Sequence, residues 1–269
     1  MKYIKYFFQF LLVIISFIIF KILGVNNSSN LSGKIFEFIG PYFRSKKLIY
    51  SNISKAYPNL NEKELKKITK AMWNNYGRVF SEYMFIKDFR SGKLSDKIEI
   101  VGKEHLDEIK NLNKQVVFIS GHFSNFELMA MQIEKSGINL GAVYRPLNNF
   151  FLDPLLEYLR MKYTCPVLVA KSRKGTREII NLVKNGYSIA LAADQRVGQG
   201  PKVPFFKKPA HTTTIPAQLA LKYNCKLVPV HIERKNNLNF EITVHKALEI
   251  NKTGNDEEDK KNITIKLNE

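Results

Sequence analysis

A histidine and a carboxylate at positions 122 and 127 are the residues of this chain best suited, by type and spacing, to catalysis. His122 lies in the segment GHFSNFE (121–127), directly after the apolar run VVFI (116–119). A neutral imidazole can take a proton from a hydroxyl, and a carboxylate bound to the imidazole fixes its tautomer and stabilises the imidazolium. Such a pair suits the transfer of an acyl group to a hydroxyl, which is a poor nucleophile at neutral pH.

The spacing of these two residues also permits a structural interpretation. Residues five apart lie about 140° apart around a helix, so the side chains meet only if His122 precedes the helix and Glu127 lies in its first turn. Ser124 and Glu127 also have the spacing of a capping box, in which the carboxylate closes the start of the helix. The residues leave both interpretations open, and the two are compatible.

Polar residues follow other apolar runs in the same way. Arg145 follows the run 140–144, and Asp194 follows the run 189–193. Open parallel sheets bind their ligands beyond the carboxyl ends of the strands, so we expect both residues near His122. Asp194 therefore competes with Glu127 as the carboxylate that orients the imidazole. Arg145 either holds a phosphate through two N–H groups or is an ordinary surface arginine.

Four further side chains are candidates for substrate binding: Gln195, Arg196, Arg173 and Arg177. Gln195 and Arg196 directly follow Asp194, and we expect them to line the polar mouth of the site. The two arginines belong to KSRKGTR (171–177), which is either an anion site at a helix start or a solvated basic loop. His211 is a rival base. No metal-ligand spacing and no Walker or dinucleotide glycine motif occurs, and we expect neither metal nor cofactor.

The elements that must position these residues alternate between strands and helices from about residue 97. Strands are predicted at 98–101, 115–120, 140–144, 167–170, 188–193, 227–232 and 239–244, and helices at 105–112, 125–135, 150–163, 175–184 and 216–223. This alternation predicts right-handed crossovers and a largely parallel sheet, with some antiparallel pairing near its end. The predicted fold class is α/β, with a mixed, mainly parallel sheet flanked by helices.

An apolar segment begins the chain. Residues 6–20 carry no charge, and residues 22–24 extend the segment past Lys21. About 20 apolar residues span a bilayer, and no small-residue cleavage site follows, so residues 1–24 are expected to form an uncleaved membrane anchor. It either spans the bilayer or lies in the interface. Basic residues after it place the large domain on the cytoplasmic side by the positive-inside rule.

The remaining regions are divided by composition. Residues 26–33 are predicted to be a polar linker, and residues 34–95 a basic, amphipathic helical segment, which includes a helix from 62 to about 85 with a capping box at Asn61 and Glu64. That segment is either a helical cap on the main domain or a basic, aromatic face that rests on the membrane. Residues 96–250 form the α/β domain, and residues 251–269 a charged tail.

The formal net charge of +18 indicates an anionic partner, namely nucleic acid, an anionic membrane or a phosphorylated substrate. No helix-turn-helix, finger or RNA-binding aromatic signature occurs, so we expect no nucleic acid. The two cysteines, Cys165 and Cys225, lie in apolar surroundings. They indicate no disulfide framework and favour a reducing compartment.

GHFSNFE resembles the His-x4-acid motif of membrane acyltransferases, in the form found in the late acyltransferases of bacterial lipid A biosynthesis (the lauroyl/myristoyl transferase family). VYRPL (143–147), with NN and LD after it, is similar to that family's second block. ADQ (193–195), VPFF (203–206) and AHTTTIPA (210–217) are similar to its third. The similarity covers about residues 5–250. Phe126 stands where the family usually has Trp, and the family's closing segment rich in Trp, His and Arg does not occur before Glu269, which is consistent with a truncated chain.

The resemblance implies a glycerolipid-acyltransferase-like fold and a fatty acyl donor on acyl carrier protein. It implies a phosphorylated glucosamine disaccharide lipid as acceptor, at the bacterial inner membrane. An acidic carrier, a phosphorylated glycolipid and an anionic membrane all suit the basic composition. His122 is then the general base and Arg145 a phosphate ligand, with direct transfer because no Ser or Cys lies in a recognisable elbow. The alternatives are another lipid acceptor (glycerol phosphate or a mannosylated lipid) or a non-catalytic basic protein of membrane surfaces.

Overall fold

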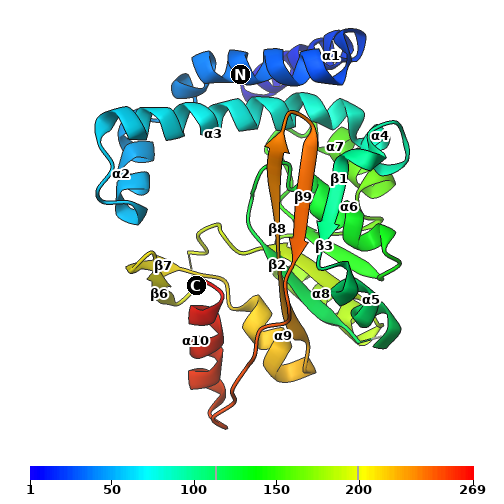
Figure 1. Ribbon diagram of the computed structural model, residues 1–269, viewed down its shortest axis with the longest axis vertical. Coiled ribbons are helices and arrows are strands. Elements are labelled where there is room, and N and C mark those ends of the chain that lie inside the picture. The colour runs from blue at the N-terminus through cyan, green and yellow to red at the C-terminus, as the bar shows by residue number, and fades with distance from the viewer. Residues whose placement is uncertain (113, 199) are drawn as a thin grey trace. The chain divides into compact units, whose positions relative to one another are not determined.

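The computed structural model describes residues 1–112, 114–198 and 200–269, which form two compact units. The first unit comprises residues 1–87 together with 206–208. The second comprises residues 88–205 and 209–269. Figure 1 draws the elements of both units along the chain, and each unit is described by itself below.

Helices make up the first unit. They are α1 (Lys2–Ile39), η1 (Gly40–Tyr42), α2 (Lys46–Ala56), α3 (Glu62–Glu82) and η2 (Tyr83–Phe85), with α4 (Ile86–Ser91) at the border to the second unit. The chain bends inside α1 because Gly24 has φ 74° and ψ 162°, which lie outside the helical region. Phe17 before the bend and Phe36 after it both contact the ring of Phe80 on α3. The capping box predicted at Asn61 and Glu64 starts α3.

The segment 26–33, expected to be a polar linker, is instead part of helix α1. Two of its serines bind α3: Ser29 Oγ donates to Glu82 Oε1 at 2.8 Å, and Ser32 Oγ donates to the carbonyl of Gly77 at 2.6 Å. A Cβ on Gly77 would lie 2.3 Å from the carbonyl oxygen of Ser32. The small, polar residues that suggested a flexible linker therefore serve close helix packing.

The first half of α1 exposes apolar side chains. Among the described residues, one helical segment, Lys2–Tyr42, is long and apolar enough to cross a membrane, judged by length and composition. Only 17% of its most apolar stretch is buried, and Leu12 and Ile22 are 66% and 79% exposed. An exposed apolar surface of this kind is consistent with membrane association.

The second unit contains a seven-stranded sheet in the order β1-β9-β8-β2-β5-β3-β4. Its strands are β1 (Ile98–Val101), β2 (Val116–Ser120), β3 (Leu140–Tyr144), β4 (Val167–Ala170), β5 (Ser188–Ala192), β8 (Lys226–Asn236) and β9 (Asn239–Val244). Every neighbouring pair is parallel except β8 and β9, which are antiparallel. The predicted mixed, mainly parallel α/β sheet is confirmed.

Helices flank this sheet (Figure 1). They are α5 (Lys103–Leu112), α6 (Glu127–Lys135), α7 (Asp153–Tyr163), α8 (Arg173–Lys184), α9 (Ile215–Tyr223) and α10 (Asp256–Lys266). Side chains alternate between the two faces of a strand, so β2 buries Val117 and Ile119 in the core with α8, α9 and α10. Phe118, between them, points to the opposite face and lines the cavity described below.

Three elements of the second half were not predicted. Strands β6 (Lys202–Phe205) and β7 (Lys208–His211) form a separate two-stranded sheet. Residues 251–269, expected as a charged tail, contain α10, which is capped by the Asn255 side chain. Ile263 of α10 is only 4% exposed and belongs to the core beside α9. Its other buried residues, Asp259 and Thr264, are polar, so this charged run shows no periodic apolar pattern that would predict a helix.

Candidate active site

The pairing of β2 with β5 places His122 beside Asp194. Ser120 and Ala192 are partners in the register of these parallel strands, and the two site residues lie two positions beyond them. The ring Nδ1 of His122 lies 2.8 Å from Oδ1 and 3.2 Å from Oδ2 of Asp194. The backbone N–H of His122 also donates to Oδ2 at 2.9 Å. The carboxylate thus holds both the ring and its backbone.

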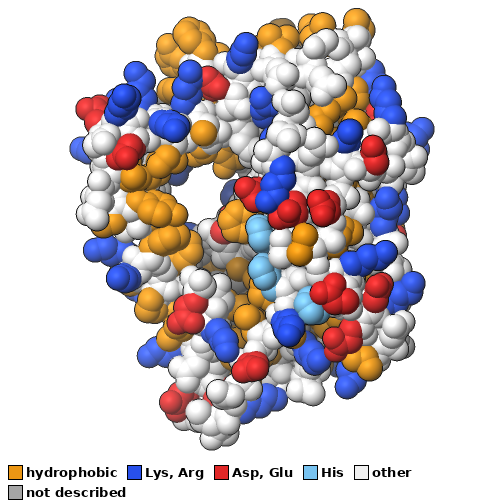
Figure 2. Space-filling model, viewed as in Figure 1, with side chains coloured by type: hydrophobic (Ala, Val, Ile, Leu, Met, Phe, Trp, Pro, Cys, Tyr) orange, Lys and Arg blue, Asp and Glu red, His pale blue; other side chains and the backbone are white. Residues whose placement is uncertain are grey.

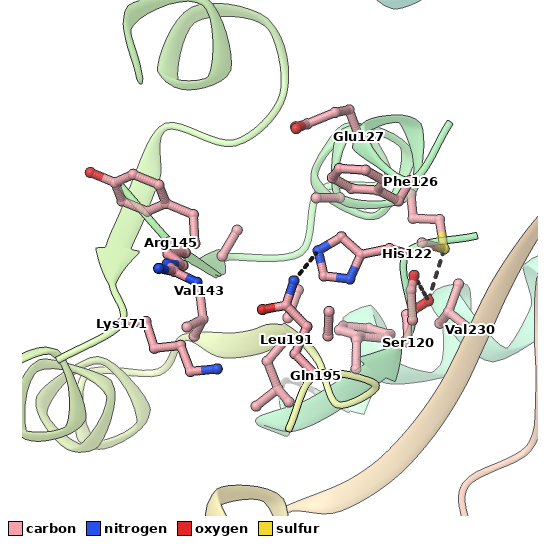
Figure 3. A pocket seen from close by; sticks show the side chains of 18 of the residues that line it. Ser120, His122, Phe126, Glu127, Val143, Arg145, Lys171, Leu191, Gln195 and Val230 are labelled. Atoms are coloured by element: carbon pink, nitrogen blue, oxygen red, sulfur yellow. Dashed lines mark hydrogen bonds between the residues drawn. The ribbon is translucent and has the colours of Figure 1, made fainter. Parts of the chain in front are cut away.

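The hydrogen bond at Nδ1 fixes the tautomer of the imidazole. An ionised carboxylate can only accept, so Nδ1 carries the proton and Nε2 has the lone pair. Nε2 lies 3.4 Å from the amide nitrogen of Gln195, which follows Asp194 (Figure 3). The ring of Phe126 packs against the imidazole at 4.8 Å between centroids. The imidazole is therefore oriented with a basic nitrogen available on the cavity side.

Asp194 stays ionised in this arrangement. Burial acts to raise its pKa, but hydrogen bonds from the side chain and the backbone of His122 outweigh burial and hold the pKa below its ordinary value. An ionised carboxylate stabilises the imidazolium that forms when the ring takes up a proton.

Glu127 has a different partner. Its carboxylate accepts from Nε of Arg160 at 3.0 Å and 3.2 Å and from Nη2 at 2.6 Å. Glu127 is 5% exposed, and the Arg160 side chain is 15% exposed, so this ion pair between α6 and α7 is largely buried. In Figure 3 the carboxylate of Glu127 points away from the imidazole of His122.

The capping box expected at Ser124 and Glu127 does not form. Helix α6 begins only at Glu127, and its N-cap residue is Phe126, which makes no side-chain capping bond. Ser124 has a positive φ of 43°, so it belongs to the turn before the helix and not to the helix start. The turn instead packs the ring of Phe126 against His122. Its conformation is therefore not the one that the capping-box spacing predicts.

A cavity of about 300 Å³ opens beside His122 (Figure 3). Apolar side chains of three neighbouring strands and of α6 form part of its wall, among them Phe118, Met129, Ile133, Ala142 and Ala190. Polar groups join the same lining, namely His122, Gln195, Arg145, Lys171 and Arg160. The cavity therefore offers apolar surface to a chain and cationic or polar groups to a head group.

Arg145 and Lys171 enter the cavity lining together for a structural reason. Tyr144 and Ala170 are register partners at the ends of β3 and β4, and the two basic residues follow them directly. Both basic residues are exposed and line the cavity. Sequence reasoning named Arg145 but missed Lys171, although Lys171 follows its strand in the same way.

Arg160 was also missed. It lies in the last turn of α7, its guanidinium lies 5.8 Å from the centre of the Tyr144 ring, and it binds Glu127. No local pattern marks a helical arginine whose partner is 33 residues away. Tyr144 donates to Glu157 at 3.1 Å, and burial, followed by this bond, raises the pKa of Tyr144 to about 12. Tyr144 is therefore neutral at physiological pH.

Other predicted residues lie outside the cavity. Among the described residues, its lining does not include Arg173, Arg177, Arg196 or His211. At the start of α8, Ser172 Oγ accepts from the backbone N–H of Gly175 at 2.9 Å, which is an ordinary helix cap. His211 Nδ1 donates to the carbonyl of Gly200 at 2.6 Å.

Comparison with known proteins adds the family. The whole chain, residues 1–269, matches the family described as bacterial lipid A biosynthesis acyltransferase. The chain belongs to this family. The lipid A biosynthesis lauroyltransferase of Escherichia coli (strain K12) is 27% identical over 195 residues, which cover 71% of this chain and 62% of that relative. The match thus spans a little less than two thirds of the relative's length.

A solved structure is also similar. The crystal structure of the 1-acyl-sn-glycerophosphate (LPA) acyltransferase, PlsC, from Thermotoga maritima has 11% sequence identity and a TM-score of 0.38. The match covers 88% of this chain and 93% of that one. The sequence motifs predicted the lipid A acyltransferase family. The family match over residues 1–269 confirms this prediction.

Proposed function

We propose that this protein transfers a fatty acyl chain from acyl carrier protein to a hydroxyl of a lipid A precursor, with His122 as the general base. The observation that carries the proposal is the bond between His122 Nδ1 and Asp194, which leaves Nε2 as the basic nitrogen beside the cavity. Membership of the lipid A acyltransferase family supports the reaction class.

The proton moves through Nε2 of His122. The acceptor hydroxyl gives its proton to Nε2 as its oxygen attacks the thioester carbonyl, and the C–O bond forms. When the tetrahedral intermediate collapses, the C–S bond breaks and the imidazolium returns the proton to the leaving thiolate. Asp194 stabilises the imidazolium between these steps and restores the starting tautomer. The products are an ester and the free thiol of the carrier, and the enzyme is unchanged.

The cavity supplies the binding groups. The apolar walls around Phe118 and Ile133 accept the fatty chain, which leaves water with a gain in free energy. Arg145 and Lys171 bind a phosphate of the acceptor at the mouth. The net charge of +18 favours association with an acidic carrier protein and an anionic membrane.

Glu127 has a positioning role in this proposal. Its ion pair with Arg160 ties the first turn of α6, which follows the His122 turn, to α7. Asp194 is the carboxylate that orients the imidazole. The 2.8 Å contact of Asp194 with the ring supports this assignment over Glu127, which the sequence left as an alternative.

We further propose that the apolar part of α1 anchors the protein in the bacterial inner membrane, with the second unit on the cytoplasmic side. The apolar exposed surface of α1 supports insertion. Basic residues after the apolar segment favour the cytoplasmic orientation. Acyl carrier protein is then available on the same side as the cavity.

The test is an acyl-transfer assay with the full chain in membranes, labelled acyl carrier protein and a tetra-acylated lipid A precursor. We expect transfer by the wild type and loss of more than about 100-fold in His122→Ala. His105→Ala is the matched control, because His105 lies on α5 outside the cavity lining, and it should retain activity. Equal activity of His122→Ala and wild type would refute the mechanism, and transfer only to glycerol phosphate would refute the acceptor.

A further inference from the structure

A second cavity lies wholly within the first unit, and its lining shares no residue with the cavity of the proposed active site. It has a volume of about 330 Å³ and is lined by residues of α1, η1, α2 and α3. Four basic side chains take part in its lining, Arg44, Lys46, Lys66 and Lys70, together with one acid, Glu37. Lys66 and Lys70 lie one turn apart on α3 and share a face of that helix.

The charges around this cavity are not balanced. Lys70 Nζ binds Glu37 at 3.0 Å, and Lys46 lies 3.4 Å from Glu62 in an exposed pair. Among the described residues, no ion pair compensates Arg44 or Lys66. The cavity therefore retains net positive charge and is suited to an anion.

Two buried hydrogen-bond donors also belong to the lining. Thr69 Oγ1 and the indole Nε1 of Trp73 are both inaccessible to solvent and have no hydrogen-bond partner among the described residues. Thr69 is 8% exposed, and an indole nitrogen can only donate. Buried polar groups are nearly always satisfied, so two unpartnered donors one helical turn apart indicate a missing acceptor.

The apolar side chains around this cavity indicate which kind of molecule bears the anionic group. Ile49, Pro41 and the Trp73 ring add apolar surface to the same cavity. Directly beside lining residues in the sequence, Phe38 and Tyr42 expose 75% and 82% of their surface. Figure 2 shows Lys and Arg side chains gathered with hydrophobic ones over α2 and the adjoining end of α3. Exposed aromatic and basic side chains together are typical of a protein surface at a lipid interface.

We propose that this cavity binds the phosphate group of an anionic phospholipid of the membrane. The phosphate oxygens accept from Thr69 and Trp73, and Arg44 and Lys66 neutralise the charge. The first part of an acyl chain then lies along the apolar lining. This lipid is neither acyl donor nor acceptor, so the proposal stands or falls separately from the acyl-transfer reaction.

The chain offers a direct probe, because Trp73 is its only tryptophan. The full-length protein is reconstituted into vesicles of phosphatidylglycerol and phosphatidylcholine, and Trp73 fluorescence is recorded. In one preparation the phosphatidylglycerol carries bromine on its acyl chains, and in the other the phosphatidylcholine carries it, at equal mole fractions. The surface charge is the same, so only the lipid next to Trp73 differs. We expect at least about twofold stronger quenching by brominated phosphatidylglycerol.

Two pairs of substitutions locate the effect. Arg44→Gln with Lys66→Gln should make the two brominated lipids quench equally, because the uncompensated charges are gone. Lys63→Gln with Lys67→Gln removes the same amount of charge from α3, outside the cavity lining, and should leave the preference intact. Thr69→Val removes one donor at nearly constant shape and should weaken the preference. Unchanged circular dichroism of each variant shows that it is folded.

Three results would overturn the proposal. Equal quenching by both lipids in the wild type would show that the cavity does not select an anionic lipid. A preference that survives Arg44→Gln with Lys66→Gln would place the selection elsewhere. Loss of the preference on adding glycerol 3-phosphate at the concentration of accessible phosphatidylglycerol would show that the ligand is a free phosphate ester and not a lipid.

Discussion

The carboxylate of Asp194 binds His122 at two points, the ring Nδ1 at 2.8 Å and the backbone N–H at 2.9 Å. The backbone contact holds the carboxylate in place independently of the ring, so the acceptor for Nδ1–H is already positioned before any substrate binds. A preorganised acceptor of this kind lowers the cost of forming the imidazolium. Asp194 should therefore affect the chemical step more than substrate binding.

The first prediction concerns the variant Asp194→Asn. The amide keeps the size of the side chain but removes the charge and no longer enforces the Nδ1–H tautomer. We expect kcat to fall by about 10³-fold or more, as for other carboxylate-oriented histidines, while KM for donor and acceptor changes less than about threefold. Steady-state kinetics with labelled acyl carrier protein measure both values. A variant with unchanged kcat would show that Asp194 does not orient the base.

The second prediction concerns the buried ion pair of Glu127 and Arg160. Removing one partner leaves the other charge buried, so Glu127→Gln and Arg160→Gln should each lower the free energy of unfolding by about 3 kcal/mol. The double variant should lose less than the sum of the two, because it leaves no unpaired charge. Glu233→Gln, in the exposed pair with Lys235, is the control and should leave the free energy of unfolding almost unchanged.

Activity separates the roles of the two carboxylates. Well below its melting temperature, Glu127→Gln should keep far more activity than Asp194→Asn, because the partner of Glu127 is Arg160. If Glu127→Gln instead lost as much kcat as Asp194→Asn while remaining folded, Glu127 would be the orienting group after all.

The strand ends of the site could be predicted from sequence because each is marked by an apolar run that stops at a polar residue. The runs 116–119 and 189–193 placed His122 and Asp194 at the carboxyl edge of a parallel sheet. The order of the strands has no such signal. That β2 lies next to β5 is decided by packing over 72 residues of sequence separation, so the choice between Asp194 and Glu127 stayed open.

Other features could not be predicted because tertiary packing, and not the local sequence, decides their structure. The serines of segment 26–33 have the composition of a linker, but Ser32 and Gly77 use their small size for helix contact. Ser124 has capping spacing, but its positive φ serves the turn that presents His122. Arg160 could not be found, since the rotation of α7 against α6 decides its contact with Glu127.

The third prediction concerns phosphate recognition at the cavity. Arg145→Gln with Lys171→Gln removes both cations that follow β3 and β4, and we expect KM for the phosphorylated acceptor to rise about tenfold with little change in kcat. Arg173→Gln with Arg177→Gln is the matched control on α8, outside the cavity lining, and should have less than a threefold effect. A larger effect of the control pair would move the anion site to the start of α8.

The fourth prediction concerns the acyl chain. Ala190 and Ala142 are register partners on β5 and β3, and both line the cavity with Phe118. Ala190→Leu fills part of the apolar space, so kcat/KM for long acyl donors should fall about tenfold while short donors are affected less. A series of acyl carrier proteins with different chain lengths measures this, and the short donors are the internal control for folding. Equal losses at all lengths would show that the chain does not lie against Ala190.

The last prediction follows from the lowered pKa of Asp194. Burial acts to raise this pKa, but the hydrogen bonds from His122 lower it by more than burial raises it. The Asp194 carboxyl therefore holds its proton less tightly in the folded protein than in the unfolded chain. A carboxyl with a depressed pKa in the folded state stabilises the fold above its unfolded pKa, and this contribution disappears as the pH falls through the folded value. The side chain is 36% exposed, so solvent screening keeps the effect small. We expect the wild type to melt at most about 4 °C above Asp194→Asn at about pH 7 and about pH 5, with the difference shrinking as the pH falls below about 4, the ordinary pKa of an aspartic acid, and then through the lower pKa of the folded protein. Thermal unfolding of the detergent-solubilised wild type and Asp194→Asn across this pH range measures the difference in melting temperature. A difference that grows as the pH falls would contradict the hydrogen bonds between His122 and Asp194.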